Sequence, residues 1–101
     1  MTVYLLVNDE TGAVDVTGSV RGLFAALARG YHKEKPTFVN VTTEHGYTTV
    51  RINGHVIAHI YKSVNGRYLT VWEVPSVDRV EYTCTKEDAV KTIMDAFGKF
   101  E

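Results

Sequence analysis

The chain has a single cysteine among its 101 residues, and no apolar run approaches the roughly 20 residues that a membrane-spanning helix needs. One cysteine, Cys84, excludes an internal disulfide and a zinc site built from several thiolates. The first residues, Met1 to Val7, lack the basic stretch and the cleavage site of a secretory signal peptide. These absences predict a cytoplasmic protein without a membrane segment.

Motifs that carry catalysis are also missing. The sequence contains no phosphate-binding loop, no dinucleotide fingerprint and no catalytic-triad spacing. The spacing of His55 and His59 would suit a metal ion on a helix, but on a strand it is about 13 Å, too long for one ion. We therefore predict no catalytic residue, no metal site and no cofactor, and we do not expect an enzyme.

The composition is that of a soluble globular protein, with 45% hydrophobic and 23% charged residues. The net charge of −1 conceals an uneven distribution, because residues 21–67 carry seven lysines and arginines against two acids. A basic patch is predicted from Arg29, His32, Lys33 and Lys35, which follow the first helix in an expected loop, His32–Pro36. Such a patch leaves nucleic acid as an alternative partner, although a solvated loop is the more common origin of such a cluster.

Two Asn-Gly dipeptides, at positions 53–54 and 65–66, interrupt a long run of strand-forming residues. Asn and Gly tolerate the positive φ angles that a two-residue hairpin turn requires. We therefore predict a three-stranded antiparallel meander formed by Tyr47–Ile52, His55–Val64 and Arg67–Val74.

Two helices are predicted from apolar residues at helical spacing. The first is capped by Ser19 and ends at Gly30, and the second is capped by Thr85 and ends at Gly98. Gly22 lies in the first turn of the first helix and indicates a frayed start or a close packing contact. The residues expected to face the core from this helix are Val20, Leu23, Phe24, Leu27 and Tyr31.

The whole chain, residues 1–101, is predicted to be a single α+β domain of order ββαβββββα. Its antiparallel β-sheet is a meander of hairpins, with both helices packed on one face. In the last strand, alternation predicts that Val80, Tyr82 and Cys84 face inwards, which makes Cys84 a small buried hydrophobe rather than a reactive thiol. The strands outside the central meander are Val3–Val7, Ala13–Thr17, Thr37–Thr43 and Arg79–Cys84.

The side chains of the meander divide into an aliphatic face, which we assign to the helices, and an aromatic face. Two-residue turns make His59 and Trp72 a cross-strand pair, whereas a bulged turn at Asn65-Gly66 would abolish that pair. The aromatic face is either part of the core or a surface for a partner, because Tyr and Trp are enriched at interfaces. The candidate partner-binding residues are His55, His59, Tyr61, Tyr68 and Trp72.

The function predicted from these features is a small non-catalytic binding protein that acts through protein–protein contacts. Its size and composition resemble those of small accessory proteins of bacteria and their viruses, including immunity proteins and inhibitors of defence nucleases. That resemblance implies an inhibitor or accessory protein directed at a larger enzyme. The alternatives are a nucleic-acid-binding module that uses the basic 29–35 loop and the aromatic face, a homodimer formed through that face, and, third, a small enzyme.

Overall fold

The computed structural model describes residues 3–77 and 80–97 and contains two antiparallel sheets and two helices. The α+β class is confirmed, and the predicted element order holds with one additional strand. No helix within these ranges is long and apolar enough to cross a membrane. The elements are β1 (Tyr4–Asn8), β2 (Val14–Thr17), α1 (Val20–Ala28), β3 (Tyr31–Glu34), β4 (Val39–Glu44), β5 (Tyr47–Ile52), β6 (His55–Lys62), β7 (Tyr68–Trp72), β8 (Val80–Thr83) and α2 (Lys86–Ala96).

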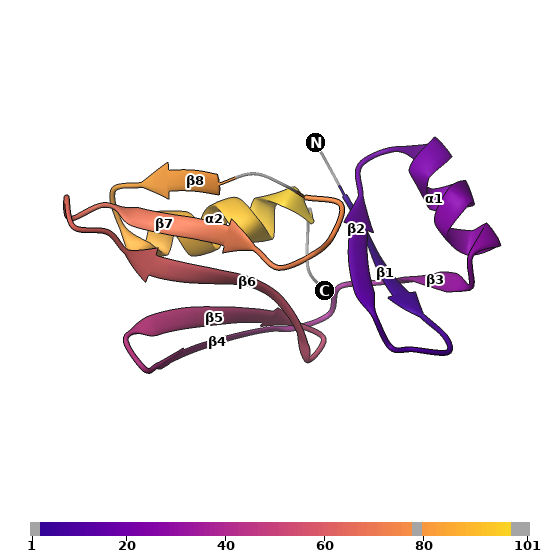
Figure 1. Cartoon of the computed structure of the whole chain (residues 1–101), viewed down its shortest axis with the longest axis horizontal. Coiled ribbons are helices and arrows are strands. Elements are labelled where there is room, and N and C mark those ends of the chain that lie inside the picture. The colour runs from indigo at the N-terminus through magenta and orange to yellow at the C-terminus, as the bar shows by residue number, and fades with distance from the viewer. Residues whose placement is uncertain (1–2, 78–79, 98–101) are drawn as a thin grey trace.

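The expected single sheet is split into a three-stranded sheet of order β2-β1-β3 and a five-stranded sheet of order β4-β5-β6-β7-β8 (Figure 1). The predicted loop His32–Pro36 is wrong, because Tyr31–Glu34 forms the strand β3. This strand pairs with β1, which separates the three-stranded sheet from the other five strands. Gly30, with φ of 90°, ends α1 abruptly, and β3 then pairs with β1 from Leu5–Glu34 to Asn8–Tyr31. The chain reaches the five-stranded sheet only after β3.

The first Asn-Gly turn forms as predicted. Asn53 and Gly54 have φ angles of 54° and 81°, and Ile52 pairs with His55. At the second Asn-Gly only Gly66 has a positive φ, and Lys62 pairs with Tyr68 across a longer turn. This is the bulged alternative, and it reverses the faces of β7 relative to those expected from a two-residue turn.

A second irregularity lies inside β6. Val50 pairs with Ala58 while the next residue, Arg51, pairs with Val56, so Ile57 is an extra residue in the ladder. Because of the longer turn, Trp72 pairs with Ala58 and His59 pairs with Val71, and the predicted His59–Trp72 pair is wrong.

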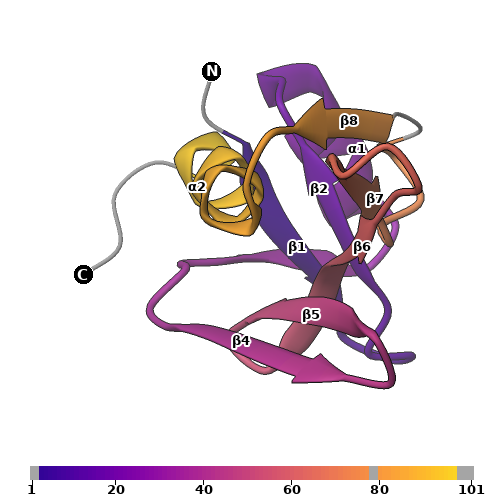
Figure 2. The same cartoon turned by 90° about the vertical axis from the view of Figure 1, so that its left-hand side faces the viewer.

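The helix α2 covers one face of the five-stranded sheet, where it contacts β6, β7 and β8 (Figure 2). Trp72 lies in this core, 7% exposed, with its ring centroid 6.3 Å from that of Phe97. The three-stranded sheet contributes Leu5 and Val16 to the same cluster, so the two sheets share one core. The other buried members of the cluster are Val50, Ile52, Ile57, Ala58, Ile60, Val74, Ala89 and Ile93.

The predicted orientation of the last strand is wrong. Since Thr70 and Trp72 of β7 are buried, Leu69 and Val71 face the opposite way, together with their β8 partners Tyr82 and Val80. Cys84, which follows β8, is an exposed free thiol rather than a buried hydrophobe.

The helix α1 begins at the predicted cap, where the Ser19 side chain accepts a hydrogen bond from the Gly22 amide. Its orientation is opposite to the expected one. A Cβ on Gly22 would lie 2.1 Å from Thr17 Oγ1, so the close packing contact anticipated for this glycine is confirmed. Ala26 is the one buried residue of α1, Leu23 is partly buried, and Val20, Phe24 and Leu27 are exposed.

Candidate functional site

The face of the five-stranded sheet opposite to α2 carries two rows of side chains that cross all five strands. Cross-strand partners in an antiparallel sheet share a face, so the register defines each row. We call this surface the open face, and we define it by Glu44, Tyr47, Tyr61, Leu69 and Tyr82 in the first row and Thr42, Thr49, His59, Val71 and Val80 in the second.

Three rings form a cluster on the open face. The Tyr47 ring meets the His59 ring edge-on at 5.2 Å and the Tyr61 ring at 5.3 Å. His59 Nδ1 forms a hydrogen bond with Thr49 Oγ1 at 3.0 Å, and its Nε2 lies 3.9 Å from Glu73 Oε1. The three rings therefore support one another across β5 and β6.

The β8 end of the open face is the more exposed end. Tyr82 is 57% exposed and Val80 is 53% exposed, while Leu69 and Val71 beside them are partly buried. Within the described ranges no helix lies over this face, because α2 is on the other side and α1 packs on the three-stranded sheet (Figures 1 and 2). The open face is thus a preformed surface of aromatic and aliphatic side chains.

The structure separates the five predicted partner-binding residues. His59 and Tyr61 lie on the open face, as their assignment to an uncovered surface requires. For Trp72 and Tyr68 that placement is wrong, because Trp72 packs against α2 and Tyr68 packs against the core cluster. His55, at the start of β6, contacts Glu34 of the three-stranded sheet.

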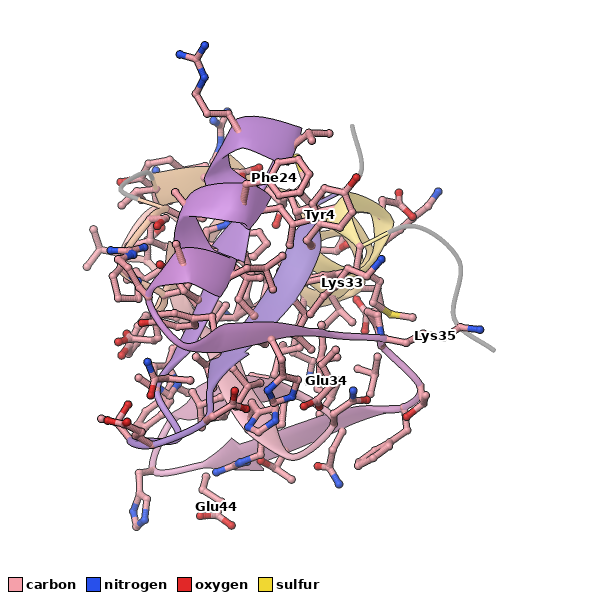
Figure 3. All side chains as sticks on the ribbon, turned by 90° about the vertical axis from the view of Figure 1, so that its right-hand side faces the viewer. Tyr4, Phe24, Lys33, Glu34, Lys35 and Glu44 are labelled. Carbon is pink, nitrogen blue, oxygen red and sulfur yellow. The ribbon has the colours of Figure 1, made fainter. Side chains whose placement is uncertain are left out.

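In the predicted basic patch, His32 and Lys33 lie on β3, Arg29 follows α1 and Lys35 follows β3, all outside the five strands that carry the open face. The guanidinium of Arg29 lies 5.6 Å from the Tyr31 ring centroid, and Lys33 Nζ lies 5.5 Å from that of Tyr4. His32 Nδ1 is instead 2.6 Å from Asp9 Oδ1. Lys35 follows β3 on the same side as Lys33 in Figure 3, next to Pro36.

A polar junction connects the two sheets. Glu34 extends from β3 toward the five-stranded sheet (Figure 3), and its Oε1 accepts hydrogen bonds from Asn53 Nδ2 at 3.0 Å and His55 Nε2 at 3.2 Å. Its Oε2 lies 3.5 Å from His32 Nε2. Partial burial raises the pKa of Glu34, but the hydrogen bond from Asn53, the charge of His55 and the hydrogen bonds from both histidines outweigh it. The net effect lowers the pKa below that of an ordinary glutamate.

Stability should therefore fall in acid, because a carboxyl with a lowered folded-state pKa stabilises the fold above its unfolded pKa and loses that contribution as protonation proceeds. We expect Glu34→Gln to lower the free energy of unfolding by about 1 to 2 kcal/mol at pH 7. Urea denaturation from pH 7 to pH 3 should show the free energies of unfolding of the parent and of Glu34→Gln converging as the pH falls through and below the range in which glutamate ordinarily titrates. Glu44→Gln, at the exposed end of β4, is the matched control. A constant difference between parent and Glu34→Gln across this range would contradict the assignment.

Sequence reasoning missed Tyr47, Val80 and Tyr82 as members of the open face. Tyr47 was expected on the helix-covered face, and the two β8 residues were expected in the core. The signal available for β8 was the Asn65-Gly66 dipeptide, because its bulged form sets the faces of β7 and hence of β8. The extra residue at Ile57 has no comparable signal, since neither Gly nor Pro marks it.

Comparison of the chain with protein-family models, with curated proteins and with solved structures finds no match. In residues 3–77 and 80–97, no three His, Cys, Asp or Glu side chains are arranged to hold a metal ion. The candidate function is therefore argued from the geometry of the surface.

Proposed function

We propose that this chain is a small non-catalytic binding protein that recognises a protein partner through the open face. The observation that carries the proposal is the pair of side-chain rows across all five strands, with Tyr82 and Val80 more than half exposed and no described helix above them. Tyrosines supply a large, rigid contact area with a hydroxyl that can hydrogen-bond, so they are enriched at protein interfaces.

The charges of the open face favour a protein over a nucleic acid. Nucleic-acid binding depends on lysines and arginines that neutralise phosphates. Near the three-ring cluster the cation is Arg51, whose Nη1 donates to Thr42 Oγ1 at 3.0 Å, and the acids Glu44 and Glu73 lie on or beside the same face. An aromatic surface with so little positive charge suits an inhibitor or accessory protein that occupies a surface of a larger enzyme.

The test begins with partner capture on the immobilised chain, from the cell that produces it, at high salt and after nuclease treatment. We expect Tyr82→Ala and Tyr61→Ala each to weaken binding of the captured protein by at least 2 kcal/mol, about thirtyfold, because aromatic anchors dominate interface energies. Their folding stabilities should change by about 1 kcal/mol or less, since both side chains are exposed.

Lys91→Ala is the matched control, because Lys91 is exposed on α2 on the opposite side of the sheet. Affinities can be compared by surface plasmon resonance. If both tyrosine variants bound the captured protein with unchanged affinity, the open face would not be the binding surface. Retention on nucleic acid that is lost with salt would instead favour the nucleic-acid alternative.

A further inference from the structure

The solvent side of α1 carries three large apolar residues in one stripe. Val20, Phe24 and Leu27 are spaced i, i+4 and i+7 and are 55%, 65% and 44% exposed. Gly22 and Ala26, nearly opposite on the helix, form the contact with the sheet. The helix thus rests on the protein through its small residues and presents its large apolar residues to solvent.

The surroundings of this stripe are cationic. Arg21 lies beside it on α1, whose first turn has no acidic residue, and Lys33 lies over the Tyr4 ring next to Phe24 (Figure 3). Arg29, the C-cap residue of α1, lies nine residues after Val20 and therefore on the opposite side of the helix, over the Tyr31 ring. Within α1 and β3 the one acid is Glu34, and its carboxylate is bound to Asn53 and His55 on the other side of β3. The exposed stripe therefore has two cations near it, Arg21 on α1 and Lys33 on β3, and α1 itself carries no acid.

We propose that α1 docks, as a helix, into a hydrophobic groove of a partner protein whose rim is acidic. Apolar anchors at i, i+4 and i+7 are the pattern by which a helix fills such a groove, and Arg21 and Lys33 complement an acidic rim. A second copy of the chain fits poorly, because an isologous contact would bring Arg21 and Lys33 of both copies together. A nucleic acid fits poorly too, because Val20 and Leu27 offer no flat ring on which a base could stack.

This docking surface is separate from the open face. The helix α1 packs on the three-stranded sheet at the end of the molecule remote from β4–β8 (Figure 1). Each surface can therefore be tested with the other intact, and the failure of one proposal leaves the other standing.

The experiment places the photo-reactive residue benzoylphenylalanine at position 24 in the full chain and irradiates it in an extract of the producing cell. The expected result is a cross-link to a protein, mapped by peptide mass spectrometry to an apolar groove bordered by Asp and Glu. Charge reversal of both Arg21 and Lys33 to Glu should reduce the cross-link yield at least tenfold. Arg67→Glu, in the exposed turn between β6 and β7, is the matched charge control and should leave the yield unchanged.

Benzoylphenylalanine at position 82 reports separately on the open face. Cross-links from position 24 to lipid, to nucleic acid or to a second copy of the chain would each overturn the proposal. It would also be overturned by a cross-linked protein site without an acidic border, by yields insensitive to the charge reversal, or by no cross-link at all. Thermal unfolding of the charge-reversed protein, compared with the parent, excludes loss of the fold as the cause.

Discussion

Trp72→Ala is expected to lower the free energy of unfolding by about 3 to 5 kcal/mol, which is most of the stability of a domain of this size. Trp72 is buried between β6 and α2, where it pairs with Ala58 and packs against Phe97. Removing the indole leaves a cavity that the closely paired strands cannot close. Urea denaturation followed by circular dichroism measures the loss.

Trp72→Phe separates packing from hydrogen bonding at this position. Within the described residues Trp72 Nε1 has no hydrogen-bond partner, so phenylalanine removes no bond and should cost less than about 2 kcal/mol. Tyr82→Ala, on the open face, should cost still less. If Trp72→Ala were as stable as the parent, the placement of Trp72 in the core would be wrong.

Asn53→Ala is expected to lower the free energy of unfolding by about 2 to 4 kcal/mol, because one amide connects the two sheets. Its Oδ1 accepts from Thr37 N at 2.9 Å, from Thr37 Oγ1 at 3.0 Å and from Phe38 N at 3.3 Å. Its Nδ2 donates to Glu34 Oε1 and to the Lys35 carbonyl at 2.8 Å. The substitution would remove these hydrogen bonds. It would also place alanine at a positive φ of 54°, a backbone conformation that alanine adopts at a cost in free energy.

Two variants separate the amide from the backbone. Asn53→Gly removes the amide but tolerates the positive φ, so it should cost nearly as much as alanine if the hydrogen bonds dominate. Asn65→Ala removes the asparagine of the other Asn-Gly turn, where Oδ1 accepts from the Arg67 amide at 3.0 Å and is exposed, and should cost about 1 kcal/mol or less. Equal losses for Asn53→Ala and Asn65→Ala would contradict a role of Asn53 in joining the sheets. Equilibrium denaturation measures all three.

The parts of the fold that the sequence predicts are those fixed by local chemistry. The positive φ angles of Asn53 and Gly54, and the caps at Ser19 and Thr85, depend only on neighbouring residues. The strand β3 was missed because His-Lys-Glu is a poor strand sequence, and β1 supplies the pairing that makes it one. Its formation is a tertiary effect, and it is the reason for two sheets instead of one.

The candidate site was harder to predict because a strand shifted by one residue exchanges its faces. The aromatic character of an uncovered face was anticipated through His59 and Tyr61. The longer turn at Gly66 placed Trp72 inside and Tyr82 outside, and the extra residue at Ile57 placed Tyr47 on the same face as Tyr61. The outward stripe of α1 was missed for a different reason. Helical periodicity locates an apolar stripe, but the contact of Gly22 with Thr17 decides which side of the helix meets the sheet.

In the five-stranded sheet every strand pairs with the strand that precedes or follows it in the chain. Each pairing therefore closes a short loop at a small cost in chain entropy, which favours rapid formation of the meander. The burial that stabilises these strands is long-range by contrast, since Leu5 and Val16 complete their core from the other sheet. We therefore expect substitutions in the hairpins to change mainly the rate of folding, and substitutions of Leu5 and Val16 to change mainly the rate of unfolding.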